Sequence, residues 1–191
     1  MSASDAAPVA QYLADRANAS SAAEFPQDAE RSSRAGLYAW WCSDSGLDVL
    51  SASFDRRLPP LIYAGQTGAT SSRAGVERVA TLASRIGGNH LSGNIGSSTF
   101  RQTLSAALRE PLRLEGSGGR LDRESNSAVS AWMRTHLEIA IVPIDDRLTL
   151  ANLEDDVLNI LDPPLNLMGM PRSPVRSRLK ELRKELRAAT A

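Results

Sequence analysis

The chain has few of the residues on which several classes of protein depend. Of its 191 residues, one is cysteine and two are histidine. The single cysteine, Cys42, excludes an intrachain disulfide framework, and with no further ligand at suitable spacing it also excludes a structural zinc site. No apolar stretch approaches the roughly 20 residues of a transmembrane helix, and residues 1–10 lack the basic and apolar regions of a signal peptide. We therefore expect a cytoplasmic protein with no membrane contact.

Phosphate-binding and nucleophile motifs are also missing. The sequence has no GxxxxGK[ST] loop and no GxGxxG that follows a strand, so no cradle for a nucleotide cofactor is visible. Ser92 and Ser98 lack the context of a nucleophile elbow.

An excess of charge of either sign is absent as well. The 22 basic and 22 acidic residues cancel, and the isoelectric point is near 6.7, which gives no overall support for nucleic-acid binding. The distribution is uneven, however. Residues 1–30 carry five acids and one base, whereas residues 172–187 carry seven bases and two acids. We expect the basic segment to follow a phosphate backbone.

The length and the 42% hydrophobic content indicate one domain with terminal extensions. Residues 1–33 predict a short helix, near Pro8 to Ala17, followed by a polar linker that Pro26 interrupts. Residues 34–170 form the predicted domain. Within residues 171–191, the stretch from Ser173 to Ala189 predicts a basic C-terminal helix whose apolar positions recur at helical spacing: Val175, Leu179, Leu182 and Leu186.

Three stretches predict strands. Gly36 to Cys42, GLYAWWC, is apolar at every position, as expected for a strand covered on both faces. Leu61 to Gly65 reads as a second strand, and Leu137 to Ile144 alternates as a third. Because residues 43–60 show no helical pattern, we expect a loop or a loose hairpin extension there and an antiparallel pairing of the first two strands.

Four further helices are predicted inside the domain. One begins near Ser72 and ends at Gly87-Gly88. The others run from a cap at Ser98 or Thr99 to Leu108, from Ser125 to Met133, and from a cap at Thr149 or Asn152 to Asp162-Pro163-Pro164.

Two of the strands contain a tyrosine near a glycine. Gly36 precedes Tyr38 by two residues, and Gly65 follows Tyr63 by two. A strand tyrosine is usually part of the core. Glycine at these positions would instead let a phosphate or a neighbouring side chain approach closely.

Arg85 and His90 follow these strands in the sequence. Arg85 is close to the predicted end of its helix, where a guanidinium either complements the helix dipole or binds two phosphate oxygens. Arg78 is the alternative on the same helix. His90 lies in a glycine-rich stretch, so we expect an exposed imidazole that accepts a proton near neutral pH.

Glu154 and Asn166 complete the set of candidate residues. Acids in the first turn of a helix are mostly solvated groups that favour the helix dipole. A metal ligand would need an inward carboxylate, and Glu154 is the acid that lies between Leu150 and Leu158 at helical spacing. Asn166 stands between two leucines. A buried amide there must be hydrogen-bonded, either as a structural fastener or as a group that orients an active site.

In this order, Gly36-Leu37-Tyr38, Tyr63-Ala64-Gly65, Arg85, His90, Glu154 and Asn166 resemble the GIY-YIG nuclease family over roughly residues 34–168. The resemblance implies an α+β fold, with a small three-stranded antiparallel sheet flanked by helices, to which this chain adds N- and C-terminal helices. It implies one Mg²⁺ (or Mn²⁺) on Glu154. Tyr38 would take the proton of the attacking water with help from His90. Tyr63 and Arg85 would bind the phosphate, and Asn166 would hold the site together.

The resemblance therefore predicts an endonuclease that hydrolyses phosphodiester bonds in DNA, with duplex, branched and single-stranded forms all open. The chain departs from the family pattern at Ala64, in the long connection of residues 43–60, and in the glycine-containing interval of five between Arg85 and His90. Two alternatives stay open: a nucleic-acid-binding module with the same fold and little catalysis, and a protein-interaction domain. A homodimer is compatible with cutting both strands.

Overall fold

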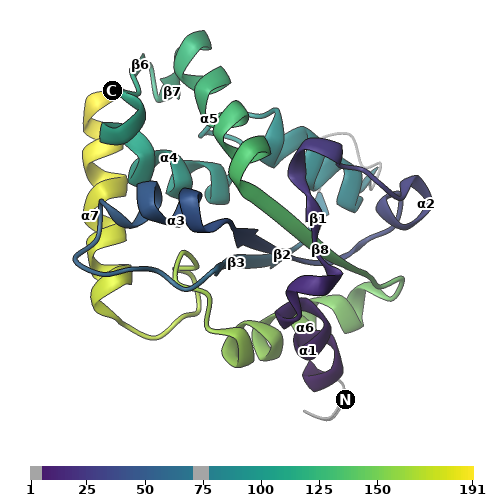
Figure 1. The fold of residues 1–191 in the computed structure, drawn as a ribbon. Helices are drawn as coiled ribbons and strands as arrows, with labels where there is room; N and C mark the ends of the chain where they lie inside the picture. The colour runs from purple at the N-terminus through teal and green to yellow at the C-terminus, as the bar shows by residue number, and fades with distance from the viewer. Residues whose placement is uncertain (1–5, 71–77) are drawn as a thin grey trace.

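The centre of the structure, a computed structural model that describes residues 6–70 and 78–191, is a four-stranded antiparallel sheet (Figure 1). Its strands lie in the order β1 (Ser20–Ser21), β8 (Leu137–Pro143), β2 (Gly36–Cys42) and β3 (Leu61–Gln66). The predicted α+β class and the three longer strands are confirmed. The predicted number of three strands is wrong, because two residues of the expected polar linker pair with β8 as a fourth strand.

β2 is the inner strand on which the arrangement depends. All seven of its residues are buried, as the uniformly apolar sequence predicts. In register, Tyr38 lies opposite Gly65, and Trp40 lies opposite Tyr63. Because side chains alternate along a strand, Tyr38 and Trp40 enter one core while Leu37 enters the other.

Helices cover both faces of the sheet (Figure 1). The core that contains Leu37 is closed by α1 (Ala6–Ala14) and α6 (Arg147–Leu161). The core that contains Tyr38 is closed by four helices: α3 (Asp44–Ser51), α4 (Thr99–Leu112), α5 (Arg123–His136) and α7 (Pro174–Ala189). Ser98 caps α4 and Ser173 caps α7 through their hydroxyl oxygens, so both predicted helix starts are confirmed.

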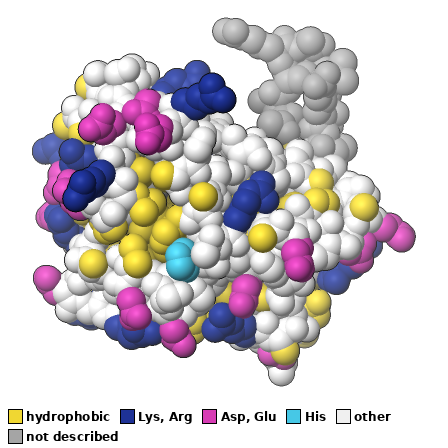
Figure 2. All heavy atoms as spheres, turned by 45° about the horizontal axis from the view of Figure 1, so that its top comes forward, with side chains coloured by type: hydrophobic (Ala, Val, Ile, Leu, Met, Phe, Trp, Pro, Cys, Tyr) yellow, Lys and Arg dark blue, Asp and Glu magenta, His cyan; other side chains and the backbone are white. Residues whose placement is uncertain are grey.

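The remaining elements are short. They are the 3₁₀ turns η1 (Arg16–Asn18) and η2 (Ala22–Glu24), the helix α2 (Ala29–Ser32), and the two small hairpins β4–β5 (Ala69–Thr70 and Arg78–Val79) and β6–β7 (Gly116–Ser117 and Arg120–Leu121). Among the described residues, no helix is both long and apolar enough to cross a membrane. On the face drawn in Figure 2, basic and acidic side chains lie intermixed around hydrophobic groups.

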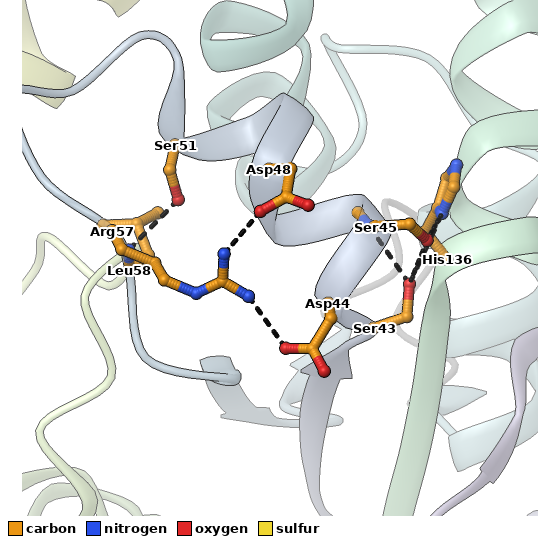
Figure 3. Close-up of polar contacts among 9 residues, drawn as sticks. Ser43, Asp44, Ser45, Asp48, Ser51, Arg57, Leu58 and His136 are labelled. Carbon is orange, nitrogen blue, oxygen red and sulfur yellow. Dashed lines mark hydrogen bonds and ion pairs between the residues drawn. The ribbon is translucent and has the colours of Figure 1, made fainter.

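The connection between β2 and β3 contains the helix α3, so the expected loop over residues 43–60 is wrong. The Ser43 hydroxyl accepts a hydrogen bond from the Gly46 amide and caps the helix, while Leu50 is fully buried against the core. Arg57 closes the connection by pairing with two carboxylates of α3, Asp44 and Asp48 (Figure 3). Eight residues with a mixed sequence are too few for a helical period to stand out.

The helix predicted from Ser72 to Gly87-Gly88 is also different. Its first part lies outside the described residues, and Arg78–Val79 forms the strand β5. The helix that follows, η3, runs from Ala83 to Leu91 as a π-helix and continues through both glycines. Glycine ends a helix by adopting a positive φ, and neither Gly87 nor Gly88 does so.

Candidate active site

The two strand tyrosines meet at Gly65, which lies beside both rings. A Cβ atom on Gly65 would lie 3.0 Å from the Tyr38 hydroxyl oxygen and 3.4 Å from the ring of Tyr63. Such a contact with the Tyr38 oxygen is tighter than side chains normally tolerate, so the absent side chain of glycine is what lets the Tyr38 hydroxyl lie against β3. On its other side, Tyr63 stacks on Phe100 of α4, with 4.4 Å between the ring centroids.

Tyr38 is the first member of a buried chain of hydrogen bonds. Its hydroxyl lies 2.8 Å from Nε2 of His90, and Nδ1 of His90 lies 2.6 Å from the Ser98 hydroxyl. Ser98 also accepts the backbone N–H of Arg101 as the cap of α4. The expected exposure of His90 is wrong, because the imidazole is 0% exposed. Both ring nitrogens have partners, so burial leaves no polar atom of His90 unpaired.

The π-helix brings Arg85 to the same place. Hydrogen bonds in a π-helix join residues five apart, which puts such side chains near one another. The interval of five between Arg85 and His90 therefore fits a shared site. Arg85 is half-buried, and its Nε atom is buried with no hydrogen-bond partner. The side chain of the alternative, Arg78, lies outside the described residues.

The environment holds Tyr38 and His90 uncharged. Burial raises the pKa of Tyr38 to about 12, although the adjacent Arg85 guanidinium opposes the shift. Burial also raises the pKa of Tyr63, again against the charge of Arg85. The pKa of His90 falls well below its ordinary value because of burial, with Arg85 and Arg101 adding repulsion. At neutral pH the site thus pairs a phenol with a neutral imidazole beside a fixed positive charge.

Glu154 approaches from the opposite face of the sheet, on α6. Its Oε2 atom accepts a 2.7 Å hydrogen bond from the Gln66 amide at the end of β3. Burial raises the pKa of the Glu154 carboxyl, while Gln66 and the charge of Arg85 lower it. Glu154 is half-buried, as the inward-facing prediction requires.

A single carboxylate of this kind suits Mg²⁺. No group of three or more His, Cys, Asp or Glu side chains in the described part of the chain could form an all-protein metal cage. Mg²⁺ keeps several waters and binds through one or two carboxylates together with substrate phosphates. The oxygen donors of Glu154 are of the type that Mg²⁺ prefers, so Glu154 is the residue that could hold this ion.

Asn166 fastens the outer side of β3. Its Oδ1 accepts the Ala64 N–H at 3.0 Å, and its Nδ2 donates to the Ala64 carbonyl at 2.8 Å. The side chain is buried, at 7% exposure. Arg176 of α7 donates to the Asn166 carbonyl at 2.9 Å. Since Ala64 stands between Tyr63 and Gly65, these bonds fix the strand that carries half of the site.

A comparison with known protein families shows to which family this arrangement of residues belongs. A family model described as the GIY-YIG catalytic domain matches residues 36–185. The chain belongs to the GIY-YIG family. Comparison with curated proteins and with solved structures gave no match. Membership implies nuclease-type chemistry on a nucleic-acid substrate, while the roles of individual residues stay predictions.

The GIY-YIG domain of this chain gathers all six candidate residues around the β2–β3 pair. Tyr38 and His90 are bonded directly, and Arg85 acts on both tyrosines and on Glu154 through its charge. Asn166 supports the strand next to Tyr63, and its hydrogen bonds described above go to Ala64 and Arg176.

Sequence reasoning missed a buried arginine behind this GIY-YIG site. Arg101 is 0% exposed, and burial lowers its pKa to about 10, so it stays protonated at neutral pH. It donates to the His90 carbonyl at 2.9 Å and to the carbonyl and side-chain oxygens of Asn126. These partners lie on other elements of the fold, so no pattern in the sequence marks them. Gln66 was missed for the same reason, since its contact with Glu154 is tertiary.

The other histidine lies outside the site. His136 is the last residue of α5 and directly precedes β8. Its Nδ1 atom lies 3.4 Å from the hydroxyls of both Ser43 and Ser45 (Figure 3). These long contacts at the start of α3 join two helices and leave His90 as the histidine of the GIY-YIG site.

Proposed function

We propose that the protein is a metal-dependent endonuclease that hydrolyses phosphodiester bonds in DNA. The observation that carries the proposal is the 2.8 Å hydrogen bond between the Tyr38 hydroxyl and Nε2 of a buried, neutral His90. A tyrosine held only as core packing needs no base of this kind at its hydroxyl. The family match gives nuclease chemistry in general, and the choice of DNA is the proposal.

In the proposed reaction, the Tyr38–His90 pair moves the proton of the attacking water. The water oxygen forms a bond to phosphorus as the bond between phosphorus and the leaving sugar oxygen breaks, and the water proton passes to the Tyr38 oxygen. The leaving oxygen takes its proton from solvent. Tyr38 gives its own proton to Nε2 of His90, whose Nδ1–H is donated to Ser98. No tyrosinate with a pKa of about 12 has to form first. The buried imidazolium then returns this proton through the Tyr38 hydroxyl to solvent.

Arg85 and Tyr63 would bind the phosphate that is cleaved. Arg85 has a buried Nε without a partner, and the fork of a guanidinium suits two phosphate oxygens. The Tyr63 hydroxyl stays protonated because burial raises its pKa, so it can donate a hydrogen bond to a phosphate oxygen. Both groups stabilise the charge that grows on phosphorus as the water adds.

Glu154 would hold the ion, Mg²⁺ or Mn²⁺, and Gln66 would orient the carboxylate through its hydrogen bond to Oε2. When bound there, a divalent ion would neutralise charge on the phosphate and on the leaving oxygen. Asn166 would keep β3, and with it Tyr63 and Gly65, at a fixed distance from β2.

The test is cleavage of labelled duplex, branched and single-stranded DNA in Mg²⁺, Mn²⁺ or chelator. Wild type is compared with Glu154→Gln, which keeps an acceptor for Gln66 and removes the charge. Asp156→Asn is the matched control, since it removes an exposed carboxylate from the same helix. We expect metal-dependent cleavage that Glu154→Gln abolishes and Asp156→Asn retains.

Two other outcomes would replace the proposal. DNA binding without cleavage under every metal condition would leave a nucleic-acid-binding module. Neither binding nor cleavage of any substrate, with both variants as well folded as wild type, would favour a protein-interaction domain in which the tyrosines are core.

A further inference from the structure

The charges of α7 are sorted onto two flanks of the helix (Figure 1, yellow). One flank holds Arg178, which pairs with Glu181 at 3.4 Å and with Glu185 at 2.9 Å. The other, called here the basic flank, consists of residues at spacings of three and four: Lys180, Arg183, Lys184 and Arg187. At these spacings, helix side chains lie on one side. The buried leucines of α7 lie between the two flanks.

The basic flank has no acid to neutralise it. Within residues 6–70 and 78–191, none of its four side chains forms an ion pair with a carboxylate. Lys180, Lys184 and Arg187 are exposed, and Arg183 is half-buried. The charge of Arg187 lowers the pKa of Arg183, as expected of neighbouring cations. Like charges at these spacings destabilise a helix, so a polyanion on this flank would relieve repulsion.

The basic flank borders the candidate active site. Arg183 donates to the Gln102 side chain on α4, two residues beyond Phe100, on which Tyr63 stacks. The charge of Arg183 lowers the pKa of Tyr63, as that of Arg85 does. The Nε atom of Arg183 is buried with no hydrogen-bond partner, which repeats the situation of Arg85. Two incompletely bonded guanidinium groups thus act on Tyr63 from different elements.

We propose that the basic flank of α7 binds the sugar–phosphate backbone of the DNA duplex that the site cleaves, with Arg183 on the phosphate nearest the scissile bond. This inference rests on the proposed function and adds where the substrate lies. From Lys180 to Arg187 the helix rises about 10 Å at 1.5 Å per residue. Over that length one strand of B-DNA has about three intervals of 3.4 Å between phosphates and so presents about four phosphates, one for each side chain. The DNA therefore extends from Tyr63 along α7, on the side away from Arg178.

The test measures binding of a short DNA duplex in chelator, so that no cleavage occurs, over a series of salt concentrations. The triple variant Lys180→Gln, Lys184→Gln, Arg187→Gln removes the three exposed charges, and Arg183→Gln removes the fourth. Each lost phosphate contact lowers the slope of log affinity against log salt by about 0.9. We expect a decrease of about 2.7 for the triple variant and of about 0.9 for Arg183→Gln.

The matched pair of single variants is Arg187→Gln and Arg178→Gln. Both remove one positive charge from α7, on opposite flanks, with Arg187 exposed and Arg178 half-buried. We expect Arg187→Gln to reduce the slope and Arg178→Gln to leave it at the wild-type value. Equal effects of the two would show that total charge alone matters, and would overturn the inference. So would wild-type protein that binds no duplex, or a triple variant that binds like wild type.

Failure of this inference is separable from failure of the proposed function. Binding in chelator does not need a working site, so the salt series gives its answer whether or not DNA is cleaved. Cleavage with an unaltered salt slope in the triple variant would overturn the basic flank alone. An altered slope without cleavage would overturn the endonuclease alone. The thermal midpoint of each variant confirms folding, and removal of repelling charges should not lower it.

Discussion

Replacing Tyr38 by phenylalanine removes one buried oxygen and leaves the ring in the core. The change breaks the 2.8 Å hydrogen bond to His90 and leaves Nε2 of a 0% exposed imidazole without a partner. An unsatisfied buried acceptor costs about 1–3 kcal/mol. Domains of this kind have about 5–15 kcal/mol of unfolding free energy, so we expect Tyr38→Phe to fold with a lowered thermal midpoint.

The effect of Tyr38→Phe on cleavage should be larger than its effect on stability. Positioned acid–base groups contribute about 10²–10⁴ in rate, which is about 2.7–5.5 kcal/mol of activation free energy. Since Arg85 and Tyr63, the proposed phosphate ligands, are unchanged, KM for DNA should change little while kcat falls at least about 100-fold. Single-turnover cleavage at saturating Mg²⁺ measures the chemical step directly.

Tyr12→Phe is the matched control for this experiment. Tyr12 lies on α1, on the other face of the sheet, where its hydroxyl accepts a 3.4 Å contact from Arg31. The Tyr12→Phe variant also loses one hydroxyl oxygen but does not change the candidate site, so we expect it to cleave DNA at the wild-type rate. A Tyr38→Phe protein that is folded and cleaves within about threefold of Tyr12→Phe would refute the proton relay.

Three further predictions follow from contacts of the site. Gly65→Ala places a methyl group 3.0 Å from the Tyr38 hydroxyl, so cleavage should fall at least about tenfold while circular dichroism stays unchanged. Asn166→Leu leaves the Ala64 N–H and carbonyl without their partners, which should lower the free energy of unfolding in urea by about 2–4 kcal/mol. His90 binds a proton in the unfolded chain below pH about 6.5 but resists it when folded, so stability should fall as pH drops below that value, by up to about 1.4 kcal/mol per pH unit.

Each of these three has its own contradicting result. The control for Gly65→Ala is Gly88→Ala, because a Cβ atom on Gly88 would have no atom within 4 Å and the variant should cleave DNA normally. Gly68→Ala is unsuitable as a control, since Gly68 has a positive φ. Cleavage by Gly65→Ala at the Gly88→Ala rate would contradict the close approach. A urea midpoint unchanged by Asn166→Leu would mean that water replaces the amide. For His90, the pH series is repeated on His90→Gln, and parallel curves for the two proteins would contradict a buried neutral imidazole.

Much of the fold follows from local signals in the sequence. The fully apolar run at residues 36–42 predicts the inner strand, and Ser98 and Ser173 mark the starts of α4 and α7 through capping that the structure repeats. These signals depend on neighbours a few residues apart. The two-residue strand β1 and the helix α3 carry too few residues for a period, and only pairing with β8 and burial of Leu50 stabilise them.

The sequence predicted which six residues lie together but not the environment around them, and the roles of these residues in catalysis stay predictions. The order of the six residues placed them around one strand pair, as observed. The burial of His90 depends on η3 continuing through Gly87 and Gly88, which the sequence argues against. The contacts of Arg101 and Arg183 come from α4 and α7 packing on the sheet. Such contacts join residues that lie far apart in the sequence at no regular spacing, so no sequence pattern predicts them.

The bonds on the outer side of β3 have a consequence for assembly. The carbonyl of Ile62 accepts the Leu165 N–H at 3.0 Å, and both backbone groups of Ala64 are bound by Asn166. On the opposite side of the sheet, β1 pairs with Ile139, and Arg31 donates to the Ile141 carbonyl. Unpaired strand margins recruit further chains into continuous sheets and fibres. With these positions occupied from within, two copies that meet to cut both DNA strands would have to join through their helices.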